Sequence, residues 1–595
     1  MIYYVTLQQE AFEHDAYQMC SVEKSLQLLD SFTGHMIQLD TETTGLDPHI
    51  DRILLLQLGN IEETIQIVIN ASEIDIRLYK EAIESAFIIG QNLKFDIKVL
   101  FAFEIIIRNC YDTMTAEQLL YMAYPNFMIG CTEEIMMQYC DYIDSVPGWE
   151  DLKKEEKKRM LYRDEPEVAE FIYEHSGVGL KALMYRYFGE EMSKEVREEF
   201  TQELQRIETK HIIYAAKDVQ PLYKLMQMQV QRLKERDLLQ AAKVECLFIP
   251  SIAYYEWCGV HMDVPLWEQK MASDYKKMSE ALEKLNQYVV DFNDSRFLRI
   301  NLQGDLFLGW DTAPKCTINW NSNKQVIPFL TALGFNCKGI DKKTKEEKDS
   351  IDASVLEPQR HINPEFYDIY LAYTEAQKVC STYGQNYLNA INPYTNRVHT
   401  TFRAIGTDTG RLACGSQKQN QSLARIKGLP VSKEVKDTKL KCAYPQLQNL
   451  PADEITRASF CAEKGNVWIS IDYCGQESVL MADFSQDKAM MDVFLKGEDM
   501  HSTVAYMIFP NEIPRDTPIK DIKKLYKHYR QEAKGPEFKI GLLTWKHVCK
   551  IANNGEQMNA VMVWLHTFLE TTNAGLNNNS CTLLHGQGIA HKLYN

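Results

Sequence analysis

Three apolar runs follow one another within residues 35–69, and they constrain the fold more than any other feature of the chain. The runs are HMIQLD (35–40), ILLLQLGN (53–60) and TIQIVI (64–69), and turn residues such as Thr-Gly and Asp-Pro lie between them. Helical patterns follow from about Asp75 and around residues 114–122. Strands that alternate with helices predict a mixed α/β domain that extends to about Val230.

The rest of the 595 residues is long enough for several further domains. The apolar spacing is helical from Met228 to Tyr288, with GVHMDVP (259–265) as a break between two helices. A polar, turn-rich stretch covers residues 294–352. From Pro393 short β-like runs continue to Asp472, and helices follow.

Charge is distributed unevenly along the chain. The formal net charge is -17, from 82 acidic and 65 basic residues, which argues against nucleic-acid binding by the whole surface. Residues 376–450 nevertheless hold 11 Lys or Arg against 3 Asp or Glu. This basic segment is either a surface that faces phosphates or a solvated basic face.

The chain lacks the sequence marks of a membrane or exported protein. No apolar run approaches the roughly 18 to 20 residues that a bilayer-spanning helix needs, and the first 15 residues do not resemble a signal peptide. The 15 cysteines show no zinc-ligand spacing. We therefore expect a cytoplasmic protein without a membrane partner, in a bacterial cytoplasm or a phage-infected host cell.

Carboxylates and their neighbours occur at three places in the expected α/β domain. Asp40 and Glu42 stand two apart at the end of a strand, so their side chains leave the same face and can share a divalent metal. In GQNLKFD, Asp96 follows an apolar run, and the amide of Asn92 can hold a loop or touch a substrate. In YAAKD, Tyr214 and Asp218 stand four apart and share a helix face. Each motif alone is also explained by ordinary surface turns or helix faces.

Taken together, Asp40, Glu42, Asp96 and Asp218 offer four carboxylates, the number that suits two ions such as Mg²⁺. Two metals about 3.5 to 4 Å apart can activate a water and stabilise both oxygens of a phosphodiester displacement. Tyr214 is placed to orient that water. This set resembles the DEDDy 3′-5′ exonucleases, and more closely the proofreading domain of the family A, polymerase-I-like DNA polymerases of bacteriophage type.

Later segments resemble the same family. NSNKQV is similar to the thumb-tip stretch that grips duplex DNA, TGRL contains an arginine that the family uses in the minor groove, and PQLQNLP is similar to a stretch that holds the primer-template. The resemblance therefore implies DNA-binding roles for six residues in addition to Asn92: Asn321, Ser322, Lys324, Arg411, Gln448 and Asn449. Arg411 also lies in the basic segment.

The block VWISIDYCGQESVLMADFSQD resembles polymerase motif A. It implies an apolar strand that delivers Asp472 to two catalytic metals, with Tyr473 in the nucleotide pocket and Glu477 as the steric gate against a ribose 2′-OH. His501 resembles a histidine of the fingers that meets the incoming phosphates.

RQEAKGPEF resembles motif B, the nucleotide-binding helix of the fingers. Arg530, Lys534 and Phe538 are spaced four apart, so two cations and a ring share one helix face. The cations can take triphosphate oxygens and the ring can stack on a base. A solvated helix face is the alternative for the two cations.

The resemblance ends near Phe538. The family continues motif B with tyrosine and glycine, where this chain has Leu542 and Leu543, and no Asp follows Asp521 to supply the second palm carboxylate. The last 57 residues contain no Asp, two Glu and eight Asn. We expect a truncated C-terminus, with a segment that was replaced or derives from a shifted reading frame.

The sequence thus predicts an α/β, ribonuclease-H-like exonuclease domain followed by an α+β polymerase region with an incomplete palm. The expected divisions are an exonuclease domain (1–230), a helical thumb (231–392), a partial palm with motif A (393–487), fingers with motif B (488–545) and a divergent tail (546–595). The expected function is template-directed DNA synthesis with 3′-5′ proofreading, and each active site would use two Mg²⁺ or Mn²⁺. Primer-template DNA and deoxynucleoside triphosphates are the expected partners, and replication accessory proteins are further candidates. The protein is expected to be a monomer.

Two alternatives stay open at this point. The chain could act only as a 3′-5′ exonuclease with a polymerase-like DNA-binding region, because Asp472 is the single carboxylate that the palm provides. It could also be a non-catalytic half that needs a partner chain to complete the palm.

Overall fold

The computed structural model describes residues 1–538 with several gaps. The gaps are residues 8–14, 123, 125–127, 150–151, 194, 301–313, 341–346, 408, 416–417, 423–438, 444, 452 and 471–474. The predicted divergent tail, 546–595, and residues 539–545 of the predicted fingers lie outside the described residues. Among the described residues, no helix combines the length and the apolar character that crossing a membrane would require.

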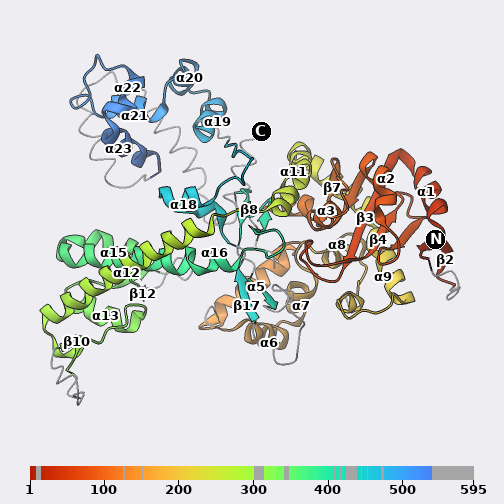
Figure 1. The fold of residues 1–595 in the computed structure, drawn as a ribbon, viewed down its shortest axis with the longest axis horizontal. Helices are drawn as coiled ribbons and strands as arrows, with labels where there is room; N and C mark the ends of the chain where they lie inside the picture. The colour runs from red at the N-terminus through yellow and green to blue at the C-terminus, as the bar shows by residue number, and fades with distance from the viewer. Residues whose placement is uncertain are drawn as a thin grey trace.

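A seven-stranded mixed sheet forms the centre of the N-terminal region (Figure 1). Its strand order is β2-β1-β5-β4-β3-β6-β7, and β4 runs antiparallel to its neighbours β3 and β5. The strands are β1 (Ile2–Val5), β2 (Tyr17–Cys20), β3 (Met36–Thr43), β4 (Ile53–Gly59), β5 (Gln66–Asn70), β6 (Phe87–Gly90) and β7 (Cys110–Asp112). The three predicted strands form β3, β4 and β5, and the predicted α/β class is confirmed.

Helices connect these strands and continue beyond them. They are α1 (Val22–Asp30), α2 (Lys80–Ser85), α3 (Leu93–Phe101), α4 (Thr113–Leu120), α5 (Glu133–Ser145), α6 (Lys154–Asp164), α7 (Pro166–Glu170), α8 (Leu180–Phe188), α9 (Thr209–Val219) and α10 (Leu222–Glu235). A short 3-10 turn, η6 (Val196–Glu199), precedes α9. Tyr214 and Asp218 therefore lie on one helix, as predicted.

The two faces of the sheet carry different side chains. On β3, Ile37 and Leu39 lie in the apolar core that helices α1, α2 and α3 complete. The alternate residues of β3, including Asp40 and Glu42, point to the other face because successive side chains of a strand alternate. Helix α9 packs across β3, β4 and β5. The acidic strand residues thus lie on the face that α9 covers.

The predicted break at residues 259–265 separates two long helices, α11 (Leu239–Cys258) and α12 (Val264–Phe292). Gly259 has a φ of 60°, and a Cβ on it would lie 2.7 Å from the ring of His399. The Asp263 side chain accepts a hydrogen bond from the Leu266 N–H at 3.0 Å and caps the new helix. Strand β8 (Val260–His261) occupies the break.

A long pair of helices, α12 and α15 (Pro364–Tyr383), extends away from the sheet (Figure 1). Their core includes Trp320, Phe329 and Phe366. The intervening stretch contains β9 (Leu298–Ile300), β10 (Pro314–Cys316), α13 (Asn323–Ala332), β11 (Lys338–Ile340), β12 (Glu347–Asp349) and α14 (Ala353–Leu356). The stretch that looked polar and turn-rich therefore includes the α13 helix, whose Val326, Phe329 and Leu330 are buried.

Short strands follow, as predicted, and then helices. The elements are α16 (Gln385–Asn389), β13 (Arg397–Val398), β14 (Phe402–Arg403), β15 (Ala413–Cys414), β16 (Lys418–Ser422), β17 (Lys439–Ala443), α18 (Glu454–Ser459), α19 (Gln476–Ser485), α20 (Lys488–Leu495), α21 (Met500–Ile508), α22 (Ile519–Leu525) and α23 (Lys527–Phe538). Helices α19 to α23 share a core that includes Val493, Ala505 and Ile522.

The strand predicted before Asp472 is not formed in the described part of this segment. Residues 466–470 have no regular structure, and Val467, Trp468 and Ile469 are 82%, 60% and 76% exposed. A strand requires a neighbour to satisfy its backbone, and no described strand pairs with these residues. The local apolar pattern was therefore insufficient to predict the strand.

Candidate functional site

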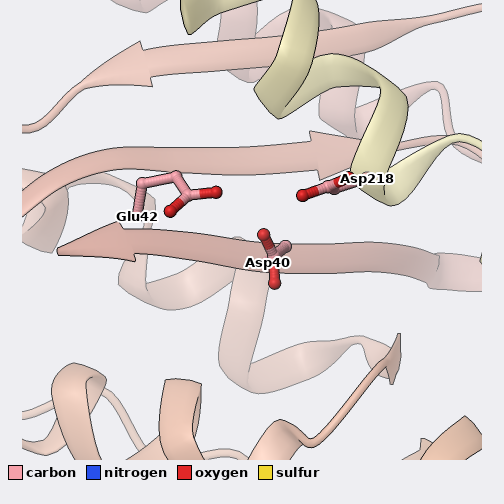
Figure 2. A group of neighbouring side chains, drawn as sticks. All are labelled: Asp40, Glu42 and Asp218. Carbon is pink, nitrogen blue, oxygen red and sulfur yellow. The ribbon is translucent and has the colours of Figure 1, made fainter. Parts of the chain in front are cut away.

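Three carboxylates meet at the face of the sheet beneath α9. Ligand oxygens of Asp40, Glu42 and Asp218 all lie within 4.8 Å of one another. Figure 2 shows Asp40 and Glu42 on one strand, β3, with Asp218 directed toward them from α9. The packing of α9 on β3 thus brings Asp218 to Glu42, which lies 176 positions earlier in the chain, and to Asp40.

Small residues let α9 approach the sheet closely. Ala215 and Ala216 are buried against Leu55 of β4 and Val68 of β5. At the start of the helix, the Glu208 N–H donates to His211 Nδ1 at 2.9 Å, which completes a reciprocal cap. These contacts fix the position from which Asp218 and Tyr214 reach the strand.

Asp96 approaches the cluster from α3 and has a partner of its own. The Thr41 hydroxyl donates to Asp96 Oδ1 at 2.7 Å, and Asp96 is buried. Asp96 is not one of the three residues whose ligand atoms lie within 4.8 Å. The structure therefore joins three of the four predicted carboxylates tightly and holds the fourth beside them through Thr41.

A further buried acid, Asp112, organises the segment that carries Asp96. Its carboxylate accepts backbone N–H groups from Leu93 at 2.8 Å, Met114 at 2.8 Å and Thr115 at 3.0 Å. It thereby caps α4 and also the first turn of α3. Asn92 lies immediately before α3 with a φ of 59°, and its N–H points to the same carboxylate at 3.3 Å. This contact is made by the backbone of Asn92, so both roles considered for its side-chain amide, holding a loop and touching a substrate, stay predictions.

The crowded carboxylates resist ionisation. Burial first, and then the negative charges of Asp96, Glu42 and Asp218, raises the pKa of Asp40 well above its ordinary value. Burial and the charge of Asp218 raise the pKa of Glu42 to about 8. Burial raises the pKa of Asp96 to about 7, although the Thr41 hydrogen bond acts to lower it.

A divalent cation fits this cluster. Carboxylate oxygens are the hard ligands that Mg²⁺ prefers, and a cation would offset the repulsion that raises these pKa values. Burial and the charges of Asp218 and Glu42 also raise the pKa of Tyr214, which keeps its hydroxyl protonated. The arrangement can hold a metal ion beside a neutral phenol.

Two supporting residues, Thr41 and Asp112, were missed from the sequence. Asp112 lies directly before the helical run TMTAEQLL, and an Asp in that place is a local signal for a helix cap. Thr41 lies between the two acids of β3 and points to the opposite face. Its partner lies 55 residues away, so no local pattern could reveal it.

Two of the predicted DNA-binding segments lie together. Gln448 Nε2 donates to the carbonyl of Leu412 at 3.1 Å, beside the exposed Arg411. The Arg411 N–H donates to the Thr407 hydroxyl at 2.9 Å. The Tyr383 hydroxyl donates a hydrogen bond to the backbone carbonyl of Asn449 at 2.5 Å. The structure therefore joins TGRL and PQLQNLP into one surface.

The thumb-tip candidates lie apart, at the start of α13. Ser322 is the N-terminal flanking residue of this helix, and Asn321 and Lys324 are exposed. The Tyr373 hydroxyl donates to Asn321 Oδ1 at 3.5 Å and links the turn to α15. α13 lies beside the outer part of the α12 and α15 pair in Figure 1.

Arg530 pairs with Asp499, the residue that caps α21, the helix that carries His501. The Arg530 guanidinium donates to both Asp499 oxygens, at 2.7 and 2.9 Å, and Asp499 caps α21 by accepting the Ser502 N–H at 2.9 Å. Burial acts to raise the pKa of Asp499, but the Arg530 and Ser502 hydrogen bonds prevail and hold it below its ordinary value. His501 lies in the first turn of α21.

The side chains of five other predicted site residues lie outside the described part of the structure. Asp472 and Tyr473 lie outside the described residues. Glu477 falls in α19, and Lys534 and Phe538 fall in α23, but their side chains are outside the described part.

Two protein-family models match the chain. Residues 310–540 match DNA polymerase family A, and residues 14–127 match a 3'-5' exonuclease. The two matches together cover more than half of the 595 residues.

Similar proteins include three bacterial DNA polymerases I. DNA polymerase I of Caldicellulosiruptor bescii is 35% identical over 185 residues, which cover 30% of this chain and 18% of the relative. DNA polymerase I of Borreliella burgdorferi is 30% identical over 204 residues, which cover 34% and 19%. DNA polymerase I of Aquifex aeolicus is 24% identical over 509 residues, which cover 84% and 67%. The first two matches thus span less than a fifth of the relatives' length.

A solved structure supports the fold. The POL domain of Pol1 from M. smegmatis, in complex with DNA primer-template and dNTP, matches with a TM-score of 0.59 and 16% identity, over 96% of this chain and 83% of that chain. The fold and the carboxylate cluster define a multidomain protein with an α/β nuclease-type site joined to a polymerase-type region. The chain belongs to the family A DNA polymerases and includes their 3'-5' exonuclease domain. The predicted family is confirmed.

Proposed function

We propose that this protein performs template-directed DNA synthesis and removes mispaired 3′ ends with its own exonuclease. The observation that carries the proposal is the cluster of Asp40, Glu42 and Asp218 beneath α9, in a chain whose later residues match DNA polymerase family A. The proposed partners are primer-template DNA and deoxynucleoside triphosphates, with replication accessory proteins as further candidates. The protein is proposed to act as a monomer in the cytoplasm.

In the proposed exonuclease reaction, divalent cations bind to Asp40, Glu42 and Asp218. Asp96, on α3, is the fourth carboxylate of the proposed metal site. Two bound Mg²⁺ or Mn²⁺ ions would supply an activated water and stabilise the leaving 3′ oxygen. Tyr214 keeps its proton and is one helical turn from Asp218, so its hydroxyl can hold the attacking water in place. Asn92 lies at the start of α3, where the frayed end of DNA would enter.

The proposed polymerase site depends on the second half of the chain. Asp472 would hold two cations, Tyr473 and Glu477 would form the nucleotide pocket, and motif B would meet the nucleotide through its cations and ring. The contributing fingers residues are His501, Arg530, Lys534 and Phe538. The bidentate contact with Asp499 would orient Arg530 for phosphate.

The duplex would lie along surfaces in the thumb and the basic segment. Arg411 and Gln448 share one surface, and the α13 turn presents an exposed lysine, Lys324. The proposed DNA contacts are Asn92, Asn321, Ser322, Lys324, Arg411, Gln448 and Asn449.

Primer extension and primer degradation, measured in parallel with Mg²⁺, test the proposal. We expect Asp40→Ala to abolish degradation and leave extension, and Asp472→Ala to abolish extension and leave degradation. Each loss should reach at least a hundredfold, because a metal-bound carboxylate acts in the transition state. Asp30→Ala removes an exposed acid at the end of α1 and serves as the control.

Two results would contradict the assignment. Extension that survives Asp472→Ala would show that another carboxylate serves the polymerase site. Degradation that Asp40→Ala leaves unchanged would show that the cluster under α9 is not the nuclease site.

A further inference from the structure

Gln57 lies beside the carboxylate cluster, on the strand next to Asp40. In the antiparallel pairing of β3 with β4, Gln57 is directly opposite Asp40, and on its other side it is opposite Val68 of β5. Directly opposed residues of an antiparallel pair point to the same face, with Cβ atoms about 4.5 to 5.5 Å apart. Gln57 therefore shares the α9-covered face with Asp40.

The Gln57 side chain is completely buried, and its polar atoms are not used by the fold. Its exposed fraction is 0%, and neither Oε1 nor Nε2 has a hydrogen-bond partner among the described residues. A buried amide without partners destabilises a folded protein relative to an apolar side chain of the same size. The rest of β4 is apolar apart from the terminal glycine, so a leucine there would continue the pattern.

Gln38, a neighbouring glutamine on the same face, shows what a structural glutamine does. Its Nε2 donates to the Asn60 carbonyl at 2.5 Å, and its Oε1 accepts the Tyr223 N–H at 2.7 Å. Gln38 thus supplies hydrogen-bond partners to a backbone carbonyl in a loop and to a backbone N–H in the first turn of α10. Gln57 has neither kind of partner, so a role in holding the fold does not explain it.

We infer that Gln57 is a positioning residue of the nuclease site, whose amide donates a hydrogen bond to the Asp40 carboxylate when a divalent cation is bound. This inference rests on the proposed exonuclease function. The amide does not bond to Asp40 in this structure, and the bond forms when Asp40 turns to the cation. Partners of this kind fix the orientation of metal-binding carboxylates, and their removal weakens metal affinity about 10-fold to 100-fold.

Titration of the full-length protein with Mn²⁺ by calorimetry tests this role. The heat that Asp40→Ala removes defines binding at the nuclease site and separates it from binding elsewhere. We expect Gln57→Met, which keeps the length of the side chain, to raise the dissociation constant for Mn²⁺ at least tenfold. In metal-free buffer its melting temperature should equal or exceed that of the wild type, because the unpartnered amide is gone.

Gln66→Met is the matched control. Gln66 is a buried glutamine at the start of β5, opposite Gly59, and its Nε2 donates to the Glu63 carbonyl at 3.0 Å. We expect this variant to melt at a lower temperature and to bind Mn²⁺ as the wild type does. Only Gln57→Met should therefore weaken Mn²⁺ binding, and only Gln66→Met should lower the melting temperature.

A dissociation constant within twofold of the wild type in Gln57→Met would overturn the inference. Gln57→Leu is judged by the same criterion and replaces Gln57→Met where that variant does not unfold cooperatively. Primer degradation is measured on the same samples, and we expect kcat to fall while KM for DNA stays unchanged. If the wild type binds Mn²⁺ at Asp40 but degrades no DNA, the proposed function fails, and the Gln57 inference is still decided by the ratio of dissociation constants.

Discussion

Glu256 Oε2 lies 2.6 Å from Lys98 Nζ, and this ion pair joins helix α11 to helix α3. Glu256 Oε1 also lies 2.7 Å from Lys94 Nζ and accepts the Phe402 N–H at 2.6 Å. Lys94 and Lys98 flank Asp96 on α3, while Phe402 begins β14 in the polymerase-family segment. One buried carboxylate thus connects the nuclease helix with the polymerase region.

Glu256→Gln should destabilise the protein by about 3 kcal/mol, because it leaves two partly buried lysines facing a neutral amide. Burial acts to raise the pKa of Glu256, but the positive charges of Lys98 and Lys94 prevail and lower it, so Glu256 is ionised in the folded protein. Urea unfolding measures the change. Glu245→Gln, at a partly buried position of the same helix, should cost less than about 1 kcal/mol, and equal effects of the two substitutions would contradict the predicted role of the ion pairs.

Metal binding at the Asp40 cluster should depend steeply on pH. The folded protein holds protons on Glu42 and Asp96, whose pKa values are about 8 and about 7, after the unfolded chain has lost them. Without metal, the free energy of unfolding should therefore fall as the pH rises from about 4.5 to about 8. Bound cation needs ionised carboxylates, so its stabilising effect should grow over the same range.

Thermal unfolding with Mg²⁺ and with chelator measures this difference. At a concentration of 100 times the dissociation constant, Mg²⁺ should add about 2.7 kcal/mol above pH 8 and much less at pH 6. The double variant Asp40→Asn and Glu42→Gln should lose most of the shift. A shift of the same size at pH 6 and pH 8.5 would contradict the assignment of these carboxylates as ligands.

Local patterns predicted the parts of the carboxylate cluster that lie within one element. The two-residue period of β3 placed Asp40 and Glu42 on one face, and the four-residue spacing in α9 placed Tyr214 with Asp218. The packing of α9 over β3 is not local, since the two segments are far apart in the chain, and only the resemblance to a family indicated it.

Residues whose roles depend on distant partners were not predictable. Glu256 lies in a helical run and meets Lys94, which is 162 positions away. Gln57 interrupts an apolar strand, a signal that becomes informative only when its register with Asp40 is known. The strand predicted before Asp472 is absent from residues 466–470 for the same reason, because an apolar run becomes a strand only beside another strand.

The contact between His49 and Trp257 should make part of the stability sensitive to acid. The two rings stack at 4.1 Å, His49 Nε2 hydrogen-bonds to the Trp257 carbonyl at 3.0 Å, and His399 lies 4.7 Å away. Burial lowers the pKa of both histidines, so the folded protein binds fewer protons than the unfolded chain. Stability from this contact is present above about pH 6.5 and is lost as the pH falls below it.

His49→Gln isolates this effect. The difference in free energy of unfolding between wild type and variant should be largest near pH 8 and should shrink by about 1 kcal/mol toward pH 5. A His49→Gln difference that grows on acidification would reverse the sign and refute the prediction.

Exposure of residues 467–469 should be visible in tryptophan fluorescence. Trp468 is 60% exposed, whereas Trp267 is completely buried against Tyr387 and Phe460. Acrylamide quenches an indole by collision, so it reaches Trp468 in the folded protein and not Trp267. We expect Trp468→Phe to lower the quenching constant of the folded protein clearly.

Trp267→Phe is the control for the loss of one fluorophore. It should leave the quenching constant unchanged or slightly higher, because a protected emitter is removed, and it should destabilise the core by about 1 to 3 kcal/mol. The same quenching constant in wild type and Trp468→Phe would show that Trp468 is covered in solution. Because the apolar segment precedes Asp472, that result would mean that residues 466–470 pack against another part of the protein in solution.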